Sequence, residues 1–435
     1  MDMYQSIIEK VDGLMPQMVT WRRDFHKYAE AGWLEMRTSS LIARYLTDLG
    51  YEVLVGEQVC KRETRMGVPS EAELEKAYER AVAQGADPQF VKATRGGMTG
   101  VIGILRCGEG PTVAMRFDID ALGVYESEDE DHFPAKVGFA SVNVGEMHAC
   151  GHDAHAASGL GVATILMEMK EQLHGTVKLI FQPSEEGLRG AKSIVENGHL
   201  EGVDYLLGAH TTGLDTEEND ITTGSEGSLA SYKYDVTFRG VSAHAGGSPH
   251  KGKNALLAAA TAVTNLYAIP RHASGATRIN VGRLIAGSGR NVIPDEAFME
   301  IEVRGETTAI NEFVSDYALR ILKASAEMHD CTVELKQMGA AESITGCVEF
   351  AEQIKDVCKN RMGLKVSDNL LMKLQGSEDF SYMINYVLSH GGKASFMRVR
   401  SATVAGAHNR KYDFDESYMT KAAKAFCGMA YELMK

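Results

Sequence analysis

Apolar residues recur at helical spacing through the first fifty positions of the chain, with polar faces between them. The two stripes are Ile7, Ile8, Val11 and Leu14, then Leu41, Ile42, Tyr45, Leu46 and Leu49. This spacing predicts two helices packed on a larger body. Residues 63–97 are charged and rich in alanine, and Ser70 ahead of Glu71 is typical of a helix start. We therefore expect one or two inserted surface helices in that segment.

Short runs of β-forming residues follow, with helical stretches such as 154–172 between them. The runs lie at 101–105, 112–117, 176–181 and 205–208, and a further one lies near 394–399. Strands that alternate with helices at this spacing predict parallel strands with helical crossovers. The fold class is therefore α/β, with a mixed, mainly parallel sheet and helices on both faces.

The pattern becomes self-contained between about residues 228 and 339. Its order is strand, helix, two strands, helix, strand, at 234–238, 254–267, 278–286, 298–304, 310–328 and 332–337. This βαββαβ order is the ferredoxin-like unit. We expect an inserted small α+β domain at 228–339, which divides the large domain into 1–227 and 340–435.

Composition narrows the class of protein. The chain has 435 residues, 44% of them hydrophobic, and a formal net charge of −14. These values predict a globular protein of two domains and argue against nucleic-acid binding, because no basic stripe is available for phosphates. No apolar run approaches the roughly 20 residues that span a bilayer, and the N-terminus lacks the features of a secretory signal. Seven cysteines without a Cys-x-x-Cys pair favour reduced thiols in the cytoplasm.

The densest chemical signal is the segment 147–155, which contains Cys150 and His152. Two residues apart on extended backbone, this thiol and imidazole face the same way. More metal-ligand types follow the predicted strands, namely Glu185, Glu186, His210 and His408. Because ligand sites in open α/β sheets gather at the carboxyl ends of strands, these side chains predict a metal site. The donor set suits Zn(II), or Mn(II) if carboxylates dominate.

The adjacent pair Glu185–Glu186 invites two roles. Neighbouring residues do not easily point the same way, so one carboxylate can bind metal while the other takes a proton from water. That division is used in metal-assisted hydrolysis. The alternative is two solvated acids in a turn.

Several motifs together resemble the aminoacylase and carboxypeptidase-G-like metallopeptidases, within their subgroup of N-acyl-amino-acid and auxin-conjugate amidohydrolases. They occur in family order at 147–155, 183–187, 209–210, 242–246, 291–294 and 376–380. The insertion from residue 63 to 100, with segments 21–30 and 409–416, resembles the members that cleave aminobenzoyl-glutamate. Departures from the family pattern are Ser184 for Ala, Ala407 for a His, and Arg410 for an acid.

The resemblance implies a zinc-peptidase-like catalytic domain that holds two divalent metal ions, Zn or Mn. It implies as ligands Cys150, His152, Glu186, His210 and His408. Glu185 would be the general base and acid, and Asp153 would orient a ligand from behind.

The resemblance also assigns residues of the small domain, which it implies is a lid and dimerisation domain. His244 would stabilise the oxyanion in a partner subunit's site, unless it is merely a turn histidine. Asn291 and Arg304, 13 positions apart, would bind the α-carboxylate of the substrate; Arg304 could instead be an ordinary surface residue. Arg278 and Arg290 are weaker candidates.

The function that follows is a metal-dependent amidase cleaving an N-acyl or N-aroyl amino acid, most specifically p-aminobenzoyl-glutamate into p-aminobenzoate and glutamate. Alternatives are a hydrolase of other N-acyl amino acids or dipeptides, or a non-catalytic subunit that needs a homologous chain for activity. Each version predicts a dimer, with an identical or a homologous partner.

Overall fold

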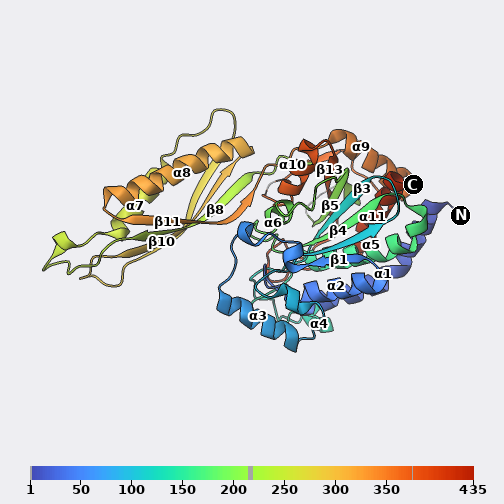
Figure 1. Ribbon diagram of the computed structural model, residues 1–435, viewed down its shortest axis with the longest axis horizontal. Helices are drawn as coiled ribbons and strands as arrows, with labels where there is room; N and C mark the ends of the chain where they lie inside the picture. The colour runs from blue at the N-terminus through green and yellow to red at the C-terminus, as the bar shows by residue number, and fades with distance from the viewer. Residues whose placement is uncertain (1, 214–218, 375) are drawn as a thin grey trace. The chain divides into compact units, whose positions relative to one another are not determined.

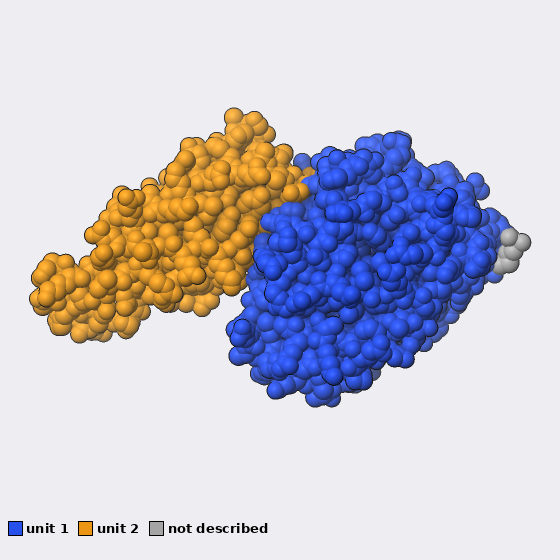
Figure 2. Space-filling view, viewed as in Figure 1, with its two compact units in different colours: residues 1–226, 345–373, 379–435 blue, residues 227–344, 374–378 orange. Residues whose placement is uncertain are grey.

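The computed structural model describes residues 2–213, 219–374 and 376–435 (Figure 1). The chain divides into two compact units (Figure 2). Unit 1 comprises 1–226, 345–373 and 379–435, and unit 2 comprises 227–344 and 374–378. Unit 2 overlaps the segment expected as the small domain, 228–339, with one more residue at its start, five more at its end and the return segment 374–378.

Unit 1 is built on a seven-stranded sheet in the order β1-β2-β4-β3-β5-β13-β6. The strands are β1 (Glu52–Val55), β2 (Val101–Arg106), β3 (Thr112–Asp118), β4 (Thr176–Gln182), β5 (Tyr205–Thr212), β6 (Ile221–Thr222) and β13 (Lys393–Arg400). The four central strands, β4, β3, β5 and β13, are parallel, and the pairs that involve β1, β2 and β6 are antiparallel. The mixed, mainly parallel sheet is thus confirmed. A separate small pair joins β7 (Gly224–Glu226) to β12 (Leu371–Lys373).

Strand β2 differs from the predicted pattern because it runs antiparallel to its neighbour β4. Only residues 107–111 connect β2 to β3. A parallel crossover needs a dozen residues or more, so a connection this short reverses the chain direction.

The α-helices described in unit 1 are α1 (Met3–Lys27), α2 (Met36–Leu49), α3 (Glu71–Ala83), α4 (Phe133–Val137), α5 (His152–Glu168), α6 (Ala191–Val195), α9 (Val348–Asp356), α10 (Ser381–Ser389) and α11 (Tyr418–Met434). Of these, α2, α5, α9, α10 and α11 pack on strands of the sheet, whereas α3 packs on α2. The two expected N-terminal helices are α1 and α2. The inserted helix α3 starts as predicted: Ser70 Oγ accepts from the backbone N–H of Glu73, whose carboxylate accepts from the Ser70 N–H. Helix α5 is apolar almost all round because it packs against α1, α11 and the sheet.

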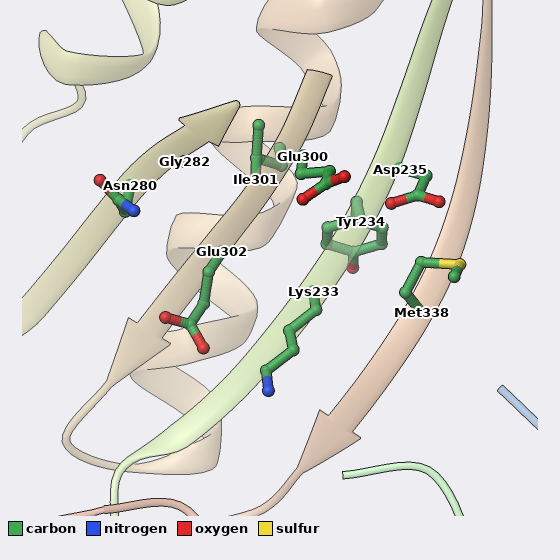
Figure 3. A pocket seen from close by; sticks show the side chains of 9 residues that line it. All are labelled: Lys233, Tyr234, Asp235, Asn280, Gly282, Glu300, Ile301, Glu302 and Met338. Carbon is green, nitrogen blue, oxygen red and sulfur yellow. The ribbon is translucent and has the colours of Figure 1, made fainter. Parts of the chain in front are cut away.

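Unit 2 is a four-stranded antiparallel sheet with two helices on one face. Its elements are β8 (Ala230–Arg239), α7 (Ala255–Tyr267), β9 (Thr277–Ala286), β10 (Glu296–Gly305), α8 (Thr308–Met328) and β11 (Thr332–Ala341). The sheet order β11-β8-β10-β9 with this element order is the ferredoxin-like fold, as predicted. On the opposite, open face a hollow of about 270 Å³ is lined by charged side chains that include Lys233, Asp235, Glu300 and Glu302 (Figure 3).

All seven cysteines are free thiols. Among the described residues, no helix is both long enough and apolar enough to cross a lipid bilayer.

Candidate metal centre

The segment with the densest chemical signal turns sharply into a helix. Helix α5 begins at His152, and Gly151 before it has φ +89°, so the extended backbone expected through Cys150 and His152 is wrong. A Cβ on residue 151 would lie 2.7 Å from Thr211 Cγ2, which leaves room only for glycine. The left-handed turn still brings the thiol and the imidazole together, and both lie in one group of potential metal ligands.

His152 presents one nitrogen for a cation. Its Nδ1 lies 3.0 Å from the Asp120 carbonyl and 3.1 Å from Asp120 Oδ1, and since both partners only accept, Nδ1 carries the proton. The Nε2 atom is buried without a hydrogen-bond partner in the described part of the chain. Burial lowers the pKa of His152, but Asp118 and Asp120 raise it well above its ordinary value. This environment therefore favours a positive ion at Nε2.

His210 is oriented in the same way at the end of β5. Its Nδ1 donates to the Thr211 carbonyl at 2.7 Å, and its Nε2 lies 3.5 Å from Cys150 Sγ. Burial and the charge of Arg398 hold the pKa of His210 well below the ordinary value. The imidazole is therefore neutral, which is the form that binds metal.

Glu186 and His408 close the cluster. The Glu186 N–H donates to Asp120 Oδ2 at 2.9 Å, and Glu186 Oε1 lies 3.4 Å from His408 Nε2. The His408 N–H donates to the Ala149 carbonyl at 2.8 Å, which holds the loop around His408 against the segment that precedes α5. The neighbouring Cys150 and Glu186 raise the pKa of His408 to about 10, although burial opposes this. Without a metal ion, the extra proton of His408 therefore lies among Cys150 and Glu186, and a metal ion would bind there only by displacing it.

The five residues predicted as ligands thus converge from four separate segments of the chain. Ligand atoms of Cys150, His152 and Glu186 lie within 4.8 Å of one another, and His210 and His408 join them through Cys150 and Glu186. The donors are thiol, imidazole and carboxylate, and Glu186 Oε1, like His152 Nε2, is buried without a hydrogen bond among the described residues. This donor set fits a divalent ion such as Zn(II).

His155 lies beside this cluster but is not available as a ligand. Its Nδ1 is hydrogen-bonded to Asp118, and its Nε2 accepts from the Thr211 N–H at 3.2 Å. Asp118 in turn accepts from Arg116 Nη1 at 2.6 Å. Both nitrogens of His155 are therefore engaged in holding β3 and β5 to helix α5.

The carboxylate that accepts a hydrogen bond from a predicted ligand, His152, is Asp120 and not Asp153. The sequence analysis did not identify Asp120. Asp153 Oδ2 accepts from Arg22 Nε at 2.8 Å and from His26 Nδ1 at 2.9 Å. These partners lie on α1, so the buried charges fix α1 to the start of α5. Although burial opposes it, hydrogen bonds to Asp153 and Glu126 raise the pKa of His26 to about 9. The signal for Asp120 was its place just past the end of β3.

Glu185 and Glu186 belong to different groups of side chains. Glu186 lies with Cys150 and His152, whereas the buried carboxylate of Glu185 lies with Asp379 in a separate acidic group. Ser184 precedes them with φ +55°, and its N–H donates to Glu35 Oε1 at 2.8 Å. This separation is what a division of roles between adjacent carboxylates requires.

The predicted residues of unit 2 lie at two ends of one strand. His244 Nδ1 accepts from the N–H groups of Gly246 and Gly247, at 3.1 and 2.9 Å, so its exposed Nε2 carries the proton and can donate. The Asn291 carbonyl accepts from the Ala245 N–H at 3.0 Å, which places Asn291 beside His244.

Arg304 lies at the other end of β10. That strand runs from Glu296 to Gly305, so eight residues, or roughly 26 Å, separate its start from Arg304. Within one chain, Arg304 and Asn291 therefore cannot bind the same small amino acid.

Comparison with known proteins decides the family. The profile of peptidase family M20/M25/M40 matches residues 114–432. The chain belongs to this family. It is accordingly a metal-dependent hydrolase of amide bonds, and the family resemblance read from the motifs is confirmed.

Three relatives of this M20 chain are informative. It is 43% identical to indole-3-acetyl-aspartic acid hydrolase of Enterobacter agglomerans, over 96% of this chain and 95% of the relative. It is 42% identical to one of the subunits of p-aminobenzoyl-glutamate hydrolase from Escherichia coli strain K12, over 98% of each. The crystal structure of the aminobenzoyl-glutamate utilization protein from Klebsiella pneumoniae matches with a TM-score of 0.84 and 38% identity, over 98% and 97%.

Proposed function

We propose that this chain hydrolyses the amide bond between an aromatic acyl group and an acidic amino acid, with p-aminobenzoyl-glutamate as the expected substrate. The observation that carries the proposal is the convergence of Cys150, His152, Glu186, His210 and His408 on one cluster, with the buried Glu185 adjacent in sequence to Glu186. Five donors of these types suit two divalent ions, Zn or Mn, which supply Lewis acidity for attack of water on an amide.

The side chains divide the remaining work. Glu185 takes the proton from the attacking water and delivers it to the leaving nitrogen. Asp120 fixes the tautomer of His152 so that Nε2 faces the cluster. His244 donates from Nε2 to the oxyanion of the tetrahedral intermediate, because its Nδ1 is already occupied by two backbone N–H groups.

The names of the relatives suggest the amino-acid half of the substrate. One relative is named for an aspartic acid conjugate and one for a glutamate conjugate, so both amino acids carry two carboxylates. On the open face of unit 2, Arg304 and Arg278 lie directly opposite each other on β10 and β9. Glu302 neutralises part of this positive charge, because its Oε1 accepts from Arg304 Nη2 at 2.9 Å, but two guanidinium groups offer more N–H donors than one carboxylate can accept. The pair therefore suits the two carboxylates of an acidic amino acid.

Arg278→Met should remove the preference for an acidic amino acid. In the described part of the chain, the side chain of Arg278 donates only to the Thr277 carbonyl, so its other donors are available to a substrate. Loss of a charge-assisted bond of about 1.5–3 kcal/mol should lower kcat/KM by about 10- to 100-fold. We expect this loss for p-aminobenzoyl-glutamate and indole-3-acetyl-aspartate, but little change for p-aminobenzoyl-glycine.

Arg283→Met is the matched control, because Arg283 is also exposed on β9 but pairs with Glu300 at 2.9 Å. A wild-type enzyme that hydrolyses none of these amides would refute the proposed function itself. A preference for the aspartate conjugate over the glutamate conjugate would favour the second candidate, an indole-3-acetyl-aspartate hydrolase.

A dimer would allow residues near the two opposite ends of β10 to act on the same substrate. If His244 and Asn291 of one subunit serve the substrate bound by Arg304 of the other, their separation within one chain is no obstacle. The partner can be an identical or a homologous chain.

We also propose that this protein is located in the cytoplasm, because its cysteines are free thiols.

This dimer predicts complementation between two inactive variants. Neither Glu185→Gln nor His244→Ala alone should turn over appreciably, but their mixed dimer contains one site with both groups intact. The isolated mixed dimer should therefore have about half of the wild-type turnover per dimer. The measurement is turnover after co-expression with two different affinity tags and isolation of the doubly tagged species. Activity no higher than that of the separate variants would show that His244 serves its own subunit or neither.

A further inference from the structure

The inserted segment 63–97 has no part in the chemistry described so far. It forms its own small core, in which Leu74, Ala77 and Ala81 of α3 pack with Met36. One end of it, however, approaches the turn that carries Glu185 and Glu186. The Met66 carbonyl accepts from Trp33 Nε1 at 2.7 Å, and the Gly67 carbonyl accepts from Arg189 Nη1 at 3.1 Å.

Arg189 holds the Glu185–Glu186 turn at the same time. Its Nε donates to the Glu186 carbonyl at 2.8 Å, and its backbone N–H donates to the Ser184 carbonyl at 3.1 Å. A single guanidinium therefore joins the turn to the insertion. The two side-chain hydrogen bonds of Arg189 come from different nitrogens, Nε and Nη1, of one planar guanidinium. The direction of one hydrogen bond therefore fixes the direction of the other.

The turn needs this support because its backbone is strained. Ser184 and Leu188 are both non-glycine residues with positive φ, at +55° and +67°. Such conformations persist only where surrounding contacts impose them. Gly32 also leaves space for the guanidinium, because a Cβ at this position would overlap Arg189 Nη2 and Ser184 Oγ.

We propose that Arg189 is a positioning residue that fixes the Glu185–Glu186 turn, and that the insertion is its anchor. The insertion thereby contributes to turnover without touching the substrate. The proposal rests on the role proposed for Glu185. Glu185 acts on the substrate directly, whereas Arg189 acts only through the backbone of the turn.

The test compares Arg189→Met and Arg189→Lys in the full chain. With Met, we expect kcat to fall by about 10- to 100-fold at saturating metal, with KM within about 3-fold and metal content unchanged. Lys can make one of the two bonds, so it should recover part of kcat. Trp33→Phe, which releases the Met66 carbonyl but leaves Arg189 intact, should lower kcat in the same direction by a smaller factor.

Hydrogen exchange supplies a readout that is independent of activity. The Ser184 and Glu186 amides donate to Glu35 and Asp120, and in Arg189→Met we expect them to exchange at least about 5-fold faster. Arg95→Met is the matched control, because Arg95 belongs to the same insertion but forms its ion pair with Glu75 on the surface. It should change neither kcat nor exchange at the turn.

Three results would overturn the inference: an unchanged kcat in Arg189→Met, a kcat that excess metal restores, or a loss that merely follows a lower Tm. Glu185→Gln in the same assay separates this failure from that of the proposed function. If Glu185→Gln is inactive while Arg189→Met is fully active, only the positioning role is wrong. If Glu185→Gln is active, the proposed role of the turn itself is wrong.

Discussion

Glu185→Gln is expected to retain its metal and to lose about 10³-fold or more in kcat. The amide is nearly the same size as the carboxylate but cannot take a proton, and general acid–base catalysis is typically worth 10²- to 10⁴-fold. Metal should stay because Glu186, and not Glu185, lies with Cys150 and His152. The measurements are metal content by mass spectrometry and turnover of p-aminobenzoyl-glutamate.

The control for this variant is Glu201→Gln, which makes the same change at an exposed position of unit 1. It should leave both metal content and kcat unaltered. Near-normal turnover of Glu185→Gln would remove Glu185 from the mechanism. Loss of metal would instead assign Glu185 to the ligands, and the division of roles within the pair would be wrong.

Removal of metal with a chelator is expected to abolish turnover, by about 10³-fold or more, and to lower Tm. Lewis acidity contributes several kcal/mol to amide hydrolysis, and no other group in the described cluster replaces it. Tm should fall because an ion that binds only the folded chain stabilises it. The measurements are turnover and thermal unfolding before and after chelation.

Refilling identifies the ion. Zn(II) or Mn(II) should restore turnover, whereas Mg(II) should not, because it prefers oxygen ligands and the cluster offers one thiol and three imidazoles. Full turnover by protein with less than about 0.1 ion per chain would contradict metal dependence altogether.

The sequence predicted which side chains cluster better than it predicted their surroundings. Glu186, His210 and His408 follow the expected strands, and the rule that ligands gather at the carboxyl ends of strands was enough to predict that they cluster with Cys150 and His152. The small domain was equally accessible, because its βαββαβ order is contiguous in the chain.

What the sequence did not predict depends on contacts between distant segments. Asp153 was assigned from the family resemblance, but the start of α5 turns its carboxylate toward Arg22 and His26. Arg189 gave no signal at all, because its role depends on a turn with positive φ and on the loop at Gly67. Side-chain direction at a turn is set by tertiary contacts that spacing does not encode.

The position of β13 has a consequence for biosynthesis. This strand lies between β5 and β6 in the sheet, yet it starts only at Lys393, and His408 follows it. Unit 2 has nearly all of its residues in one continuous stretch and can fold while the ribosome is still adding the rest. Until the last tenth of the chain emerges, β5 is an unpaired edge, open to aggregation, so a prematurely terminated product should need chaperones or be degraded.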